Sequence, residues 1–69
     1  MKTVVLNVNG MSCSHCERAI NVAVSEIKGI EKVNASVDTK TVTVTFDEDM
    51  IELQKIKEVI EEEGYDVVS

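Results

Sequence analysis

Hydrophobic and polar residues alternate in three short stretches of the chain. Residues 3–8, 33–37 and 42–46 each place apolar side chains at every second position, which predicts β-strands with one buried face. The alternation has one exception, Val5, which falls on the polar side of the first stretch. A fourth apolar stretch, residues 65–68, predicts a last short strand.

Two further segments repeat their apolar residues at helical spacing. The first begins at about Ser14, where Ser14 and Glu17 form an S-x-x-E capping box, and Gly29 stands where a C-terminal cap is expected. The second runs from about Glu52 to Glu63 and ends at Gly64. The expected inner stripes of the two helices are Cys16, Ile20, Ala23 and Ile27, and Leu53, Ile56, Val59 and Ile60.

The order of these elements, strand–helix–strand–strand–helix–strand, predicts one α+β domain over residues 1–69. It is the ferredoxin-like βαββαβ arrangement, with a four-stranded antiparallel sheet and two helices on one face. Between the middle strands, a two-residue turn at Thr39 and Lys40 would place Val37 opposite Val42.

Composition and charge exclude several classes of function. The 69 residues carry a net charge of −6, which disfavours binding to nucleic acid or to an anionic membrane surface. Apolar runs never exceed three residues, whereas a transmembrane helix needs about 20. The N-terminus has no apolar region of signal-peptide length, so we expect a cytoplasmic protein.

All of the cysteine and histidine lies in residues 10–16, Gly-Met-Ser-Cys-Ser-His-Cys. The capping box places Cys13 just before a helix and Cys16 in its first turn. Free N–H groups and the positive end of the helix dipole favour thiolates there, so lowered pKa values are expected. In a reducing compartment, such a pair binds metal or does catalysis more often than it forms a structural disulfide.

Three uses of the cysteine pair compete. A structural zinc site wants four protein ligands, and this chain offers two sulfurs and at most His15 beside them. Thiol–disulfide exchange uses the same spacing, but the chain contains no proline and so lacks the cis-proline that faces the active site in thioredoxin-type folds. Soft thiolates select Cu(I), and two of them suffice for a two-coordinate ion.

Residues 10–16 resemble the GMxCxxC signature of the heavy-metal-associated domain. That domain occurs as CopZ-type bacterial copper chaperones and as N-terminal domains of copper-transporting P-type ATPases. The resemblance covers the whole chain and includes Gly29-Ile30, Val42 to Asp47, and Ile60 through Gly64-Tyr65.

The resemblance implies a role for most residues of the motif. Cys13 and Cys16 would bind Cu(I), while Met11 would point into the core and hold the loop. Tyr65 resembles an aromatic residue that bacterial members place beside the metal, where its ring limits solvent access and its hydroxyl polarises a cysteine sulfur. Ser12 fits the copper branch, because zinc and cadmium relatives often carry Asp at this position.

His15 has two interpretations: an exposed group outside the ligand set, or a ligand in a metal-bridged dimer. The expected function is a cytosolic copper chaperone, not an enzyme, which is a monomer without metal and passes Cu(I) to a copper-transporting P-type ATPase. The alternatives are an N-terminal metal-binding domain of such an ATPase and a dithiol redox protein. Acidic residues gather after residue 46, which favours a partner with basic residues around its own cysteines.

Overall fold

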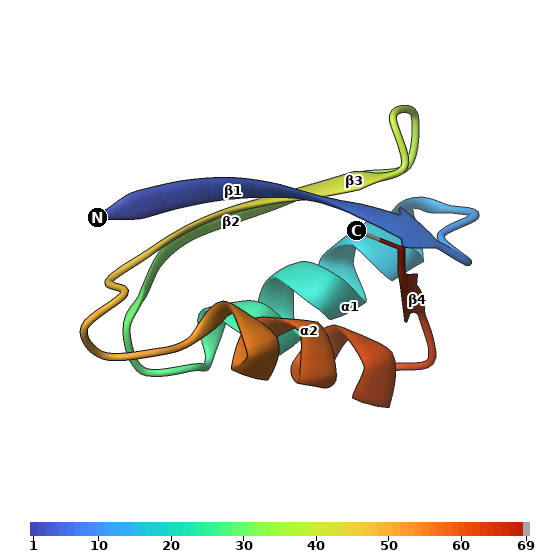
Figure 1. The fold of residues 1–69 in the computed structure, drawn as a ribbon. Coiled ribbons are helices and arrows are strands. Elements are labelled where there is room, and N and C mark those ends of the chain that lie inside the picture. Colours follow the sequence, from blue (N-terminus) through green and yellow to red (C-terminus); the bar gives the residue numbers. More distant parts are fainter. Residues whose placement is uncertain (69) are drawn as a thin grey trace.

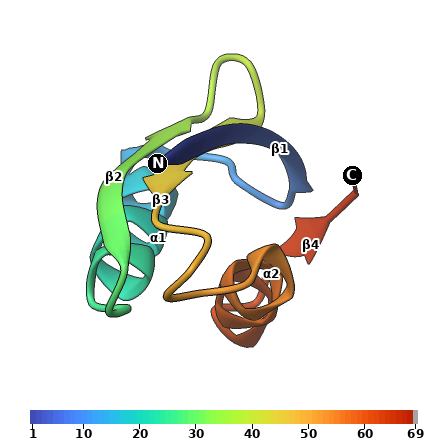
Figure 2. The ribbon, with the colours of Figure 1, turned by 60° about the vertical axis from the view of Figure 1, so that its left-hand side comes forward.

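The computed structural model describes residues 1–68, which form six elements in the predicted order. These are β1 (Lys2–Asn9), α1 (Ser14–Ser25), β2 (Ile30–Ser36), β3 (Thr41–Phe46), α2 (Leu53–Glu62) and β4 (Asp66–Val67). The sheet has the order β2-β3-β1-β4, and every neighbouring pair is antiparallel. Both helices cover the same face of this sheet (Figure 1, Figure 2), so the predicted ferredoxin-like fold is confirmed.

The core lies between the sheet and the helices, and it is almost entirely aliphatic. Each strand contributes every second residue and each helix contributes one stripe, which is the pattern that the sequence predicts. Val5 is the expected exception: it is 56% exposed on the open face of the sheet. The buried residues are Leu6, Val8, Met11, Ile20, Val24, Ala35, Val42, Val44, Phe46, Ile51, Ile56 and Ile60.

The predicted turn between β2 and β3 is wrong by two residues. Ala35, not Val37, lies opposite Val42, and residues 37–40 form a four-residue connection. Lys40 closes this connection with φ +57°, and its carbonyl accepts a hydrogen bond from the Val8 N–H at 2.9 Å. Because the register differs by two, every side chain stays on its predicted face, and the hydrophobic pattern alone cannot detect the difference.

The predicted cap at Gly29 is also wrong. The first helix ends at Ser25, with Glu26 as its C-terminal cap, and a further turn follows before β2. Gly29 has φ +106° at the entrance to β2, where a Cβ atom would lie 3.0 Å from the Met50 Cβ. This glycine therefore permits close packing of two connections and does not end the helix.

Side chains of α1 cover the outer edge of β2. The Asn21 side-chain oxygen accepts a hydrogen bond from the Ala35 N–H at 2.9 Å, and a Glu17 carboxylate oxygen accepts one from the Val37 N–H at 2.7 Å. These bonds satisfy backbone donors that an edge strand otherwise presents to solvent or to other chains.

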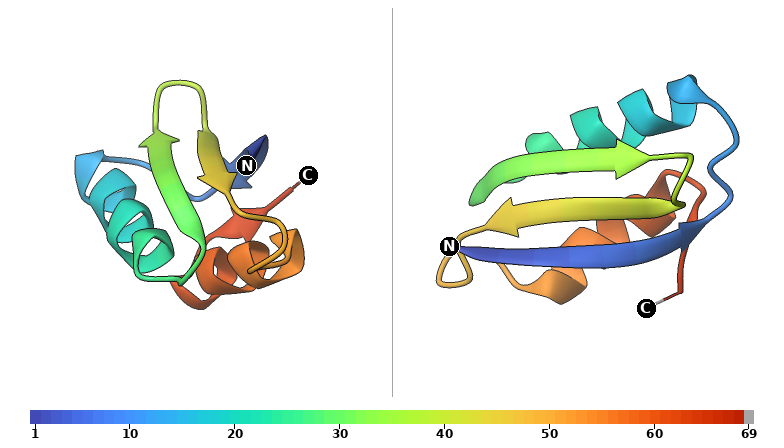
Figure 3. Two further views of the ribbon diagram at one scale, coloured as in Figure 1. Left: turned by 90° about the vertical axis from the view of Figure 1, so that its left-hand side faces the viewer. Right: turned by 90° about the horizontal axis from the view of Figure 1, so that it is seen from above.

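One end of the molecule gathers the elements that matter for the cysteines. The loop after β1, the β2–β3 connection and β4 all lie at that end, whereas the N-terminus lies at the other (Figure 3). Among the helices of residues 1–68, none is both long and apolar enough to span a membrane.

Candidate metal centre

The loop of residues 10–13 joins β1 to α1 and carries the first cysteine. Gly10 opens the loop with φ +101°, a conformation that residues with a side chain rarely adopt. A Cβ atom at Gly10 would lie 3.4 Å from the Tyr65 Cδ1. The Tyr65 ring, which precedes β4, is therefore close to the start of the loop.

The two sulfur atoms, Sγ of Cys13 and Sγ of Cys16, lie 3.9 Å apart. Both cysteines are free thiols. Cys13 is exposed in the loop, whereas Cys16 is half-buried on α1 and packs against the core. The structure thus presents one sulfur on an exposed loop and the other on a packed helix.

The capping box predicted at the start of α1 is wrong. Cys13, not Ser14, is the N-cap residue, and its side chain makes no capping hydrogen bond. Glu17 does not reach back to the helix start either, because its carboxylate binds the Val37 N–H on the neighbouring connection. The helix still begins at the predicted residue, so its free N–H groups and positive dipole face the cysteines.

Local hydrogen bonds favour the thiolate of Cys16. They lower its pKa from 9.0 to about 6, chiefly through the Ser12 backbone, then through the Tyr65 hydroxyl and the Cys13 backbone. Partial burial acts in the opposite direction but is outweighed. The Tyr65 hydroxyl donates to the Cys16 sulfur, and this bond is the main reason that the pKa of Tyr65 rises to about 12.

The other residues of the motif take distinct places. Met11 is only 6% exposed and belongs to the core cluster. Ser12 and His15 are exposed, and His15 lines a shallow hollow with Ser14 and Arg18. Within residues 1–68, no group of three or more His, Cys, Asp or Glu side chains is arranged to hold a metal ion.

Two polar residues of α1 make contacts with β2 and its connection that the sequence did not predict. Glu17 and Asn21 fall outside the expected apolar stripe, yet both are half-buried and bind the backbone of β2 or its connection. Their spacing of four residues places both on one side of the helix. This spacing is the only feature of the sequence that could have indicated their contacts with β2 and its connection.

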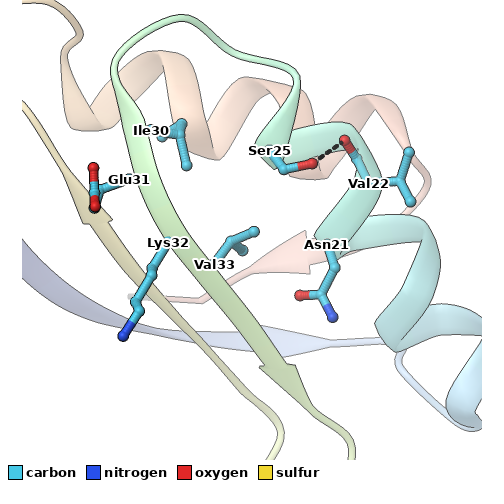
Figure 4. A pocket seen from close by; sticks show the side chains of 7 residues that line it. All are labelled: Asn21, Val22, Ser25, Ile30, Glu31, Lys32 and Val33. Atoms are coloured by element: carbon cyan, nitrogen blue, oxygen red, sulfur yellow. Dashed lines mark hydrogen bonds between the residues drawn. The ribbon is translucent and has the colours of Figure 1, made fainter.

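The larger hollows of the surface lie away from the cysteines. One of about 430 Å³ lies between α1 and β2, where Asn21, Val22 and Ser25 face Ile30 and Val33 (Figure 4). Its lining is aliphatic and polar, and it contains neither cysteine nor histidine. The candidate metal-binding side chains therefore lie at the exposed loop and the start of α1, and not in this hollow.

The family model of the heavy-metal-associated domain matches residues 5–66 of the chain. The chain belongs to the heavy-metal-associated domain family. Among its curated relatives, the copper chaperone CopZ of Staphylococcus saprophyticus is 39% identical over 67 residues, which is 97% of this chain and 98% of the relative.

Solved structures show the same heavy-metal-associated fold. A CopZ metallochaperone superposes with a TM-score of 0.95 at 36% identity, covering 97% of this chain and all of the other. The yeast copper transporter domain Ccc2a, solved in apo and Cu(I)-loaded states, has a TM-score of 0.91 at 37% identity, covering 97% of this chain and 92% of its own.

Proposed function

We propose that this heavy-metal-associated domain is a cytoplasmic copper chaperone that carries one Cu(I) between Cys13 and Cys16. The observation that carries the proposal is the pair of free sulfurs 3.9 Å apart, one on an exposed loop and the other on the first turn of α1. The near full-length similarity to CopZ of Staphylococcus saprophyticus supports copper as the cargo. The protein makes and breaks no covalent bond in a substrate, so it is not an enzyme.

The spacing of the sulfurs suits a single soft ion with an open side. Two metal–sulfur bonds of about 2.3 Å, the length known for zinc, together exceed the 3.9 Å between the sulfurs, so one ion can bond to both. The ion would then lie off the line between the sulfurs and leave room for a third donor. Because Cys13 is exposed, that third donor arrives from solvent.

Transfer then proceeds by ligand exchange. An incoming thiolate of the acceptor forms a third sulfur–copper bond, after which one bond to the chaperone breaks and that sulfur leaves as a thiolate. Copper remains Cu(I) throughout and remains bonded to sulfur.

The donor set favours Cu(I) over Zn(II). Thiolates are soft ligands that suit Cu(I), whereas structural zinc takes four protein ligands. The described part of the chain brings no third His, Cys, Asp or Glu side chain into a metal-holding group with the cysteines. Ser12 adds no carboxylate to the loop, and His15 stays outside the ligand set as an exposed neighbour.

The proposed acceptor is the metal-binding domain of a copper-transporting P-type ATPase. A chain with a net charge of −6 associates fastest with a partner that carries basic residues around its own cysteines. This partner would supply the incoming thiolate from a similar loop.

An anaerobic Cu(I) titration against a chromophoric chelator tests the site. The unmodified protein should bind one Cu(I), and Cys13→Ser or Cys16→Ser should each lower the affinity by orders of magnitude. Ser12→Ala serves as the control, since it leaves both sulfurs in place. Binding by either cysteine variant as tight as that of the unmodified protein would refute the assignment.

A second candidate is the metal-binding domain of a copper transporter, favoured by the similarity to yeast Ccc2a at 37% identity. An immunoblot of the source cells separates the two candidates. A band near 7.6 kDa indicates a free chaperone, and a band of membrane-protein size indicates a domain of a transporter.

A further inference from the structure

Glu17 directly follows Cys16 on the first turn of α1, and its side chain reaches a different part of the fold. One carboxylate oxygen accepts the Val37 N–H at 2.7 Å. Glu17 is half-buried, so this bond is partly shielded from water. Hydrogen bonds to a charged acceptor are among the stronger ones in proteins.

The connection that Glu17 binds also holds the other side of the cysteine loop. Within residues 37–40, the Lys40 N–H donates to the Val37 carbonyl at 3.3 Å, and the Lys40 carbonyl accepts the Val8 N–H at 2.9 Å. Val8 lies two residues before the loop and Glu17 lies four residues after Cys13. One short turn therefore anchors the chain on both sides of residues 10–13.

At the start of α1, the Cys16 sulfur accepts hydrogen bonds from the backbone of Ser12 and Cys13, but no side chain caps the helix. Its N-cap residue, Cys13, makes no side-chain capping hydrogen bond. An uncapped helix start leaves several N–H groups without partners and opens more easily than the rest of the helix. The bond from Glu17 to Val37 is thus well placed to restrain the turn that carries Cys16.

We propose that Glu17 is a positioning residue of the metal centre: its bond to the Val37 N–H fixes Cys16 relative to the cysteine loop. This inference rests on the proposed Cu(I) binding by Cys13 and Cys16. Residues that orient metal ligands from outside the ligand set are worth about 10–100-fold in affinity in other metal sites.

Three variants distinguish the effect of the Glu17–Val37 hydrogen bond from the effect of the Glu17 charge and from the effect of docking α1 against β2. Glu17→Asp keeps the charge but shortens the side chain by about 1.5 Å, which takes the acceptor out of hydrogen-bond range. Glu17→Gln loses the charge but keeps an acceptor oxygen at the same reach. Asn21→Ala removes the matched bond to Ala35, one helical turn farther from the cysteines.

Two measurements apply to each variant: anaerobic Cu(I) affinity by chelator competition, and amide hydrogen exchange of the metal-free protein at Val37 and along the first turn of α1. Glu17→Asp should weaken Cu(I) binding by about tenfold and speed exchange at these amides. Glu17→Gln should stay within about threefold of the unmodified protein, because the acceptor is retained. Asn21→Ala should leave affinity within about twofold, because its site is separate.

Three results would overturn the proposal. Equal losses in Glu17→Asp and Asn21→Ala would mean that helix docking in general is responsible. Equal shifts in Glu17→Gln and Glu17→Asp, or an unchanged Glu17→Asp, would mean that the bond has no positioning role. The exchange measurement needs no metal, so it tests the anchor even if the unmodified protein failed to bind Cu(I), which would refute the proposed function instead.

Discussion

The hydrogen bond from the Tyr65 hydroxyl to the Cys16 sulfur should raise the fraction of Cys16 that is thiolate at neutral pH. This bond is the second largest of the contributions that lower the pKa of Cys16 to about 6. Tyr65→Phe removes the hydroxyl and keeps the ring, which lies close to Gly10. The backbone bonds from Ser12 and Cys13 remain, so we expect the pKa of Cys16 to rise but to stay below its ordinary value.

The rise has a direct consequence at neutral pH. At pH 7, a thiol of pKa about 6 is about 90% thiolate, and a rise in its pKa lowers this fraction. Alkylation with iodoacetamide, followed at Cys16 by peptide mass spectrometry across a pH series, measures this fraction. Equal rates in both proteins at pH values well above 9 serve as the control for access to the sulfur.

The outcome decides whether Tyr65 acts through its hydroxyl. A midpoint for Cys16 that stays near 6 in Tyr65→Phe would refute the argument. A midpoint near 9 would mean that the hydroxyl alone controls the thiolate and that the backbone bonds contribute nothing.

Further predictions concern stability and assembly. The pKa of Cys16 falls from 9.0 unfolded to about 6 folded, so its contribution to stability should be full above pH 9 and be lost as the pH falls through 6. Urea unfolding of the metal-free protein at pH 6 and pH 8 measures the change in the free energy of unfolding. Cys16→Ser should reduce the difference in that free energy between the two pH values. Gly10→Ala and Gly64→Ala should each lower the free energy of unfolding by about 1–3 kcal/mol, because both glycines have positive φ. Only Gly10→Ala should disturb Tyr65 and raise the pKa of Cys16, since a Cβ at Gly64 meets nothing within 4 Å. Copper-loaded chains should form a metal-bridged dimer, seen as an increase in sedimentation coefficient with added Cu(I); a monomer at every loading would contradict it.

The order of the elements could be predicted because it depends on local patterns. The alternation along β3 and the helical stripe of α2 each show which side chains are buried in the core. Both elements were predicted within one residue of their observed ends. The closeness of Cys13 and Cys16 is also local, since a CxxC pair at a helix start brings its two side chains to the same end of the helix.

The hairpin register could not be predicted from the same signals. A shift of two residues leaves every side chain on its own face, so burial does not distinguish Val37 from Ala35 as the partner of Val42. In the folded chain, Lys40 adopts φ +57° at the end of the connection, and its carbonyl accepts a hydrogen bond from the Val8 N–H on β1. That contact exists only once the sheet has formed.

Local patterns were enough to predict the fold class, the family signature and the neighbouring pair of cysteines, because hydrophobic periodicity and short spacings act within a few residues. The contact that Glu17 makes depends on how the chain folds. The capping-box pattern predicted that its carboxylate binds the start of α1. The carboxylate instead accepts a hydrogen bond from the Val37 N–H, 20 residues away in the chain. A backbone donor that leaves water needs a partner, and an acceptor that is near in space, though distant in sequence, satisfies it.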